Sequence, residues 1–303
     1  MKNCFFFLTF LLIAVGCDFN QPRKQFDTSV YLSSLPYSVD ELQNALENEA
    51  SSPIRQMQIL SELYHKTVQN DTSAAFAYLH QMSDLEHNLS DLFAKSIFYN
   101  AMGNYYHKKD SLQKAVDMYD QVLLLLTDDS SIHFQDERAM ALASKGIIFQ
   151  QYDDYETAYT LYLEAENLYL NTENYNRLVN LYGKMGNIFQ RNSNVERYNQ
   201  IMQKVNDFID KVTAPDAMVD YYNQQGSVCM YDEEYEKSAD FYQKALEILK
   251  QTQNLYQLHT VYYNLGLVAR KQGLHEEAKK YYRISFDIQT GVFSKNFTSD
   301  EAW

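Results

Sequence analysis

The side chains that could carry out chemistry are scattered along this sequence, and their spacing does not match a catalytic or metal-binding pattern. The run His275–Glu277 lacks the His-Glu-x-x-His spacing that places two imidazoles on one face of a helix. The acidic runs Asp153–Asp154 and Asp232–Glu234 lack the alternating ligands and the central glycine of a calcium loop. The glycines are too widely spaced to form a phosphate-binding loop. We therefore expect a non-enzymatic protein with no catalytic residue, no metal ion and no cofactor.

Cys17 is the residue at which we expect a covalent modification. It follows an apolar run, Phe5–Val15, that is too short to span a bilayer and is typical of a signal peptide. The residues Ala14–Cys17 resemble the lipobox of bacterial lipoproteins, in which the chain is cut before the cysteine and the cysteine is acylated. This resemblance implies a signal peptide over residues 1–16, lipid attachment at Cys17, and a location in the bacterial cell envelope facing the periplasm, on either membrane. An ordinary signal peptide with an incidental cysteine is the alternative.

The charge of the chain limits its partners. The formal net charge is −14 at pH 7, so the protein repels phosphate backbones and we expect no nucleic-acid partner. The same charge disfavours lying flat on anionic lipid, so acyl chains at Cys17 would provide the contact with the membrane. A chain with 46% hydrophobic residues but only 9 glycines and 4 prolines has material for a core and few helix breakers. The composition favours an all-helical protein.

The elements that must position any site are indicated by a repeat. Five glycines recur at intervals of 43, 40, 40 and 40 residues: Gly103, Gly146, Gly186, Gly226 and Gly266. Twelve residues after them stand Ala115, Ala158, Tyr198, Ser238 and Ala278, and sixteen after them Tyr119, Tyr162, Met202, Tyr242 and Tyr282. The positions around each glycine share one side of a helix, and those twelve and sixteen residues later share one side of a second helix. The pattern predicts stacked helix–turn–helix units, each buried against its neighbours.

The segment Tyr262–Gly266, followed by Ala278 and Tyr282, resembles the consensus of the tetratricopeptide repeat family in a long, 40-residue form. The resemblance implies a right-handed superhelical solenoid of about six repeats over residues 38–290. A polar tether over 17–37 would precede it and an irregular tail over 291–303 would follow.

Further residues indicate a divergent first repeat, the starts of individual helices and two departures from the repeat pattern. A first, divergent repeat has Leu63 in place of the glycine, with Ala75 and Leu79 at the two later positions. Ser38 and Glu41 form a capping box, and Pro53 and Pro215 each open a helix. Two departures from the family pattern are a bulky Tyr198 where a small residue is expected and a charged Lys145 where an apolar one is expected. We expect the repeat of Tyr198 to pack more openly.

The family resemblance implies that the first helix of each unit lines a groove in which a peptide binds. Its residues are polar, nearly uncharged and rich in amides, and an amide can both donate to and accept from a peptide backbone. The candidate binding residues are Asn100, Asn104, Gln150, Asn180, Asn187, Gln190, Asn223, Ser227, Tyr263 and Arg270. The near absence of lysine and arginine argues against the two-carboxylate clamp of chaperone-binding relatives.

These observations favour an adaptor that is anchored in the envelope by a lipid and binds a protein or peptide segment in its groove. One alternative is the sensor portion of a signalling protein, because the chain resembles the part of bacterial regulators in which a signal and long repeats precede a membrane helix and a DNA-binding module. Others are a subunit similar to envelope-assembly lipoproteins, or a nutrient-binding lipoprotein, although no large insertion that could form a sugar site is present.

Overall fold

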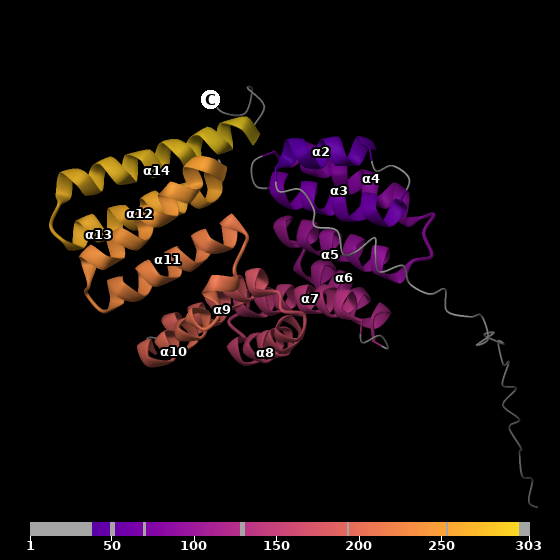
Figure 1. Cartoon of the computed structure of the whole chain (residues 1–303), viewed down its shortest axis with the longest axis horizontal. Helices are drawn as coiled ribbons and strands as arrows, with labels where there is room; N and C mark the ends of the chain where they lie inside the picture. The colour runs from indigo at the N-terminus through magenta and orange to yellow at the C-terminus, as the bar shows by residue number, and fades with distance from the viewer. Residues whose placement is uncertain are drawn as a thin grey trace, which may run out of the picture. The chain divides into compact units, whose positions relative to one another are not determined.

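The structure is a computed structural model that describes residues 38–48, 52–68, 71–127, 131–192, 194–252 and 254–296, and these residues contain helices and no strand. The predicted all-α class is confirmed. Consecutive helices form antiparallel pairs (Figure 1). The helices are α2 (Val39–Asn48), α3 (Pro53–Thr67), α4 (Thr72–Glu86), α5 (Leu92–Lys108), α6 (Leu112–Leu125), α7 (Ile132–Gln151), α8 (Tyr155–Asn171), α9 (Tyr175–Arg191), α10 (Val195–Asn206), the short 3-10 helix η1 (Ile209–Lys211), α11 (Pro215–Tyr231), α12 (Tyr235–Thr252), α13 (Leu255–Lys271) and α14 (His275–Asn296).

After α2, the described helices form six pairs, from α3 with α4 to α13 with α14, as the repeat predicts. The capping box before α2 is confirmed, because Ser38 Oγ accepts the Glu41 N–H at 3.2 Å and the Glu41 carboxylate accepts the Ser38 N–H at 3.2 Å. Pro53 and Pro215 are the first residues of α3 and α11. Helix α14 differs from the expectation of an irregular tail from residue 291, since it continues through Gly291 to Asn296. A single glycine lowers helix stability by about 1 kcal/mol and need not end a helix.

The turn inside four of the described pairs has the same backbone geometry. Left-handed residues occur seven positions after the glycine at Asp110, Asp153, Glu233 and Gly273. The next N–H then bonds back to a carbonyl of the first helix, as in Asp154 N–H to Phe149 O at 3.0 Å and Leu274 N–H to Ala269 O at 2.9 Å. This motif satisfies carbonyls that the end of a helix would leave unpaired. It also reverses the chain within three residues, so the second helix returns along the first.

The recurrent glycines allow the two helices of a pair to approach closely. A Cβ added to Gly226 would lie 2.6 Å from Tyr242 Cε1, and one added to Gly266 would lie 2.6 Å from the Tyr282 ring. Gly103 and Gly146 face Tyr119 and Tyr162 in the same way. These tyrosine rings occupy the space that a larger residue in the first helix would need. The spacing of small and aromatic residues in the sequence thus corresponds to direct contacts.

In two pairs, other residues fill the contact between the two helices, which we call the seam. In the first pair, Leu63 and Leu79 replace the glycine and the tyrosine, and both are buried. In the fourth, the Tyr198 ring and the Met202 Cε lie 3.0 Å and 2.8 Å from the Cβ position of Gly186. Tyr198 and Met202 are both buried, at 4% and 2% exposure, and both side chains contact the backbone position of Gly186. The seam between α9 and α10 is therefore closed, contrary to the more open packing expected from Tyr198.

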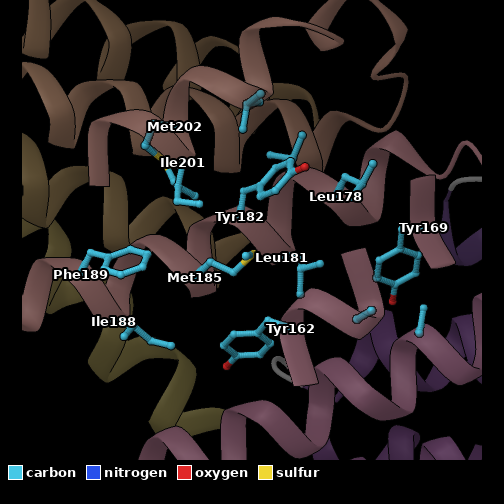
Figure 2. Packing of buried hydrophobic residues seen from close by; sticks show 14 of the residues in the cluster. Tyr162, Tyr169, Leu178, Leu181, Tyr182, Met185, Ile188, Phe189, Ile201 and Met202 are labelled. Atoms are coloured by element: carbon cyan, nitrogen blue, oxygen red, sulfur yellow. The ribbon is translucent and has the colours of Figure 1, made fainter. Parts of the chain in front are cut away.

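The buried residues form clusters that extend over neighbouring pairs. One cluster of buried side chains extends from α7 to α11, and Figure 2 shows part of it, including Tyr162 of α8, Met185 of α9 and Met202 of α10. The charged Lys145 lies at the edge of this core, where its ammonium group pairs with Asp120 of α6 at 2.5 Å. Each pair thus buries its apolar surface against its neighbours, as expected for a stacked repeat.

Candidate protein-binding face

The first helices of successive pairs form one layer. Neighbouring first helices contact each other along the series α3, α5, α7, α9, α11 and α13. Each second helix from α4 to α12 also contacts the first helix that follows it. Side chains of α5, α7, α9, α11 and α13 that point away from the second helices line the exposed side of this layer, which we call the first-helix face. The register of the glycines therefore places equivalent residues of each repeat side by side on this face.

The predicted binding residues of α5 and α7 are engaged in bonds within the protein. Asn100 is only 3% exposed, and its Nδ2 donates to the backbone carbonyl of Glu137 at 3.1 Å and to its carboxylate at 2.6 Å. Asn104 Oδ1 accepts from Tyr64 Oη at 2.9 Å. Gln150 Oε1 accepts from Tyr162 Oη at 2.8 Å. These three amides connect helices, and their bonds would have to break before they could bind a partner.

The predicted residues of α9 are more accessible. Asn180 and Asn187 are exposed and Gln190 is half-buried. Asn180 donates to Asp220 Oδ2 of α11 at 3.0 Å. Asn187 and Gln190 make no side-chain hydrogen bond to the described residues. Their amides are therefore available to a ligand.

The remaining predicted residues lie on α11 and α13. Asn223 and Ser227 are half-buried, and the Ser227 hydroxyl donates to the Asn223 carbonyl at 3.0 Å and lies 3.2 Å from Tyr242 Oη. Tyr263 is 48% exposed, with its ring 5.7 Å from that of Tyr282. Arg270 is exposed near the end of α13. The accessible part of the predicted set is thus concentrated on α9 and α13.

Charged residues outside the candidate binding set connect α9, α11 and α13. The Asp220 carboxylate accepts from Asn180 and, at 3.0 Å, from Gln257 Nε2 of α13. Burial raises the pKa of Asp220. Burial also lowers the pKa of Lys184 to about 8, although Asp220 acts in the opposite direction. The face is therefore polar as predicted, but it carries charges that the amide-rich pattern did not indicate.

A second group of charges involves α3, α7 and α9. Burial raises the pKa of Glu137 to about 7, against the opposing effect of the hydrogen bond from Asn100. Burial lowers the pKa of His65 to about 4. Arg177 of α9 interacts electrostatically with Glu62 and Glu137. Residues of three different repeats thus influence one another across this part of the first-helix face.

In three repeats, a polar residue ten positions before the glycine bonds to the start of the next repeat. Asp136 accepts from Thr172 Oγ1 at 2.6 Å and from Asn174 Nδ2 at 2.8 Å. Asn176 Oδ1 accepts the N–H groups of Thr213 and Ala214, both at 3.0 Å. Asp216 accepts from Asn254 at 3.3 Å. In the sequence, the polar residues at this position, one helical turn before the candidate binding residues, could have indicated these bonds.

The structure shows few other features that could support chemistry. No three histidine, cysteine, aspartate or glutamate side chains among the described residues form a group that could hold a metal ion. No helix in the described part of the chain is long and apolar enough to cross a membrane. Cys229 is a buried free thiol. Cys17, for which lipid attachment is predicted, lies outside the described residues.

Comparisons with known proteins agree with this architecture. Residues 218–291 match the family model described as tetratricopeptide repeat. A Rap protein complexed with competence and sporulation factor has 14% identity and a TM-score of 0.60, with 85% of this chain and 71% of that chain covered. Apo RapI has 11% identity and a TM-score of 0.57, covering 85% and 92%. Cut9 in the APC/C hetero-tetramer Cut9–Hcn1 has 16% identity and a TM-score of 0.56, covering 89% and 56%.

No curated protein matches the sequence. At these identities the solved structures bear on the fold alone. The chain therefore matches the tetratricopeptide repeat by sequence over residues 218–291, and its stacked helix pairs have the same all-helical repeat fold as these solved structures.

Proposed function

We propose that this protein is a non-enzymatic interaction scaffold that binds an extended protein segment along the first-helix face from α9 to α13. The proposal rests on the side-chain amides of Asn187 and Gln190, which lie on this layer and make no hydrogen bond to the described residues. Each amide offers both a donor and an acceptor, which matches the alternating groups of a peptide backbone. Tyr263, half-exposed on α13, adds an aromatic surface for an apolar side chain.

The comparisons support this class of function. Tetratricopeptide repeats suggest interaction scaffolds, and two of the similar structures contain a second molecule: competence and sporulation factor in one, Hcn1 in the other. A stacked repeat spreads its binding surface over several units instead of forming one deep pocket. The accessible polar side chains on both α9 and α13 fit that mode of binding.

The proposal includes an envelope location. The lipobox-like residues Ala14–Cys17 support acylation at Cys17 and retention on a bacterial membrane, with the repeats facing the periplasm. Intact-mass analysis of the mature amino terminus tests this part. A diacylglyceryl mass on Cys17 in the wild type, and its loss in Cys17→Ser, is the expected result; an unmodified Cys17 in membrane fractions would refute the anchor.

A second candidate is the sensor portion of a signalling protein, which the last described helix favours. Phe286 of α14 is 61% exposed, whereas Leu246, the equivalent residue forty positions earlier in α12, is 5% exposed beneath α13. An apolar side chain at the end of a stack favours coverage by a further element. Such an element could transmit a binding event on the first-helix face to an output module.

Site-specific photo-crosslinking tests the binding face. A photoreactive residue at Asn187 should form a defined crosslinked product in cells, whereas one at Gln243, exposed on the second helix α12, should not. The Asn187→Ala, Gln190→Ala double variant should reduce the yield at a neighbouring probe position by about 2- to 10-fold, the range of a lost neutral hydrogen bond. Equal products from positions 187 and 243 would place the binding surface elsewhere.

A further inference from the structure

A hollow of about 380 Å³ lies on the other side of the fourth repeat, away from the first-helix face. It is bounded by the second helices α8 and α10, with α9 beneath them. The residues that line it are Tyr159, Phe189, Arg197, Gln200, Ile201 and Lys204. Nothing in the proposed binding along α9 to α13 uses this hollow.

The hollow lies on the irregular fourth repeat. Helix α10 has only 12 residues, whereas the second helices α8 and α12 have 17 and 18. Tyr198 and Met202 keep the inner contact between α9 and α10 closed, so the hollow is confined to the outer side of this pair.

The floor of the hollow is apolar. Phe189 is 9% exposed and Ile201 is 6% exposed, and Figure 2 shows both at the same end of the core cluster. The ring of Tyr159 meets that of Phe189 edge to face, with 5.3 Å between centroids. A flat aromatic or branched aliphatic group could replace water over this floor with a gain in free energy.

The rim carries one cation that has no carboxylate partner. Lys204 Nζ pairs with the buried Glu166 carboxylate at 2.8 Å, so its charge is neutralised within the protein. The Arg197 guanidinium lies over the Phe189 ring, 5.5 Å from its centroid, and no carboxylate of the described residues is within ion-pair distance of it. Stacking leaves the in-plane N–H groups of a guanidinium free, and this fork matches the two oxygens of a carboxylate.

We propose that this hollow binds a single carboxylate attached to an aromatic or branched aliphatic body, with the carboxylate on Arg197 and the body over Phe189 and Ile201. A group with several negative charges is disfavoured, because the chain has a net charge of −14 and only one rim cation is unpaired. The carboxylate comes either from a small organic acid or from an acidic residue beside an aromatic one in a polypeptide. The proposal does not depend on the first-helix face.

Titration calorimetry of the 303-residue chain with two probes separates these sources. The probes are 3-phenylpropionate and the end-blocked peptide acetyl-Ala-Phe-Asp-Ala-amide, with 3-phenylpropionamide as the uncharged analogue. We expect at least one charged probe to bind with a dissociation constant near 1 mM or below, about −4 kcal/mol. Binding of phenylpropionate supports a small-acid source, and binding of the peptide alone supports a polypeptide source. The uncharged amide should bind at least tenfold more weakly than the acid.

The variant Arg197→Gln should weaken binding of the charged probe by about tenfold or more, because a hydrogen bond to a charged group is lost. Arg197 is exposed, so the variant should keep the wild-type melting temperature. The matched control is Arg283→Gln, which removes an exposed arginine from the second helix α14 and should bind like the wild type. No heat from either charged probe up to about 10 mM, or equal affinity in Arg197→Gln and wild type, would overturn the proposal.

Discussion

At the scale of single residues, a polar side chain on the first-helix face can be used in hydrogen bonds within the protein and so be unavailable to a partner. Asn100 looks like a free amide in the sequence, yet both of its described bonds go to Glu137 of the next first helix. The Glu137 carboxylate accepts one of these bonds, and its burial raises the pKa of Glu137 to about 7. Ionisation of this one group should therefore affect the stability of the fold near neutral pH.

Glu137→Gln should make the protein less sensitive to pH between about 5 and 8. The pKa of Glu137 is higher in the folded than in the unfolded chain, so its protonated form favours folding. This contribution is complete below the unfolded value, near 4.5, and is lost as the pH rises through about 7. Thermal unfolding at pH 5 and pH 8 should show that the variant gains stability over the wild type as the pH rises.

The control for this experiment is Glu164→Gln, which changes an exposed carboxylate on α8. Its melting temperature should follow that of the wild type at both pH values. If Glu137→Gln differed from the wild type by the same amount at pH 5 and pH 8, ionisation of Glu137 would not contribute to the pH dependence.

At the scale of the helix pair, stability depends on the contact between one glycine and one tyrosine. Gly226→Ala should destabilise the protein by about 1–3 kcal/mol, because the new methyl group would lie 2.6 Å from the Tyr242 ring and overpack the seam. In Gly226→Ala, Tyr242→Leu the smaller side chain accommodates the methyl group, much as Leu63 and Leu79 fill the seam of the first pair. Denaturant unfolding should therefore give a double variant less destabilised than the sum of the two single variants.

Gly291→Ala is the matched control for this cycle. Gly291 also lies inside a helix, but a Cβ there would meet nothing within 4 Å. That substitution should stabilise α14 by about 0.5–1 kcal/mol through the backbone entropy of glycine. Additive effects of Gly226→Ala and Tyr242→Leu would show that the glycine–tyrosine contact does not determine the spacing of the pair.

The sequence predicted the pairs well because their seams use the same residue types at the same spacing. Gly226 and Tyr242 could be matched from periodicity alone, and so could the divergent pair of Leu63 and Leu79. The binding face was harder to predict, because an amide in a column does not reveal its partner. Asn100 and Asn187 occupy similar places in the pattern, yet one is buried on Glu137 and the other is exposed. Their difference depends on which residue the neighbouring repeat supplies.

At the scale of the whole stack, each described repeat contacts the ones beside it, so cooperativity depends on the interfaces between neighbours. The polar residues ten positions before the glycine, Asp136, Asn176 and Asp216, connect three of the repeats to the start of the next one. Among them, Asn176 makes two bonds with one atom, because its Oδ1 accepts the two backbone N–H groups directly before α11. This single side chain should couple the unfolding of α9 and α10 to that of α11 and the helices after it.

Asn176→Ala should uncouple the repeats on the two sides of it. Without the amide, the N–H groups of Thr213 and Ala214 lose their acceptor, which costs about 1–3 kcal/mol where water does not replace it. Hydrogen exchange monitored by mass spectrometry should show faster exchange in α11–α14 and unchanged exchange in α5–α8. Asn187→Ala, on the same helix but without a hydrogen bond to the described residues, should leave both regions unchanged. Equal acceleration on both sides of residue 176 would instead mean that the stack unfolds as one unit and that its stability is not divided among neighbouring interfaces.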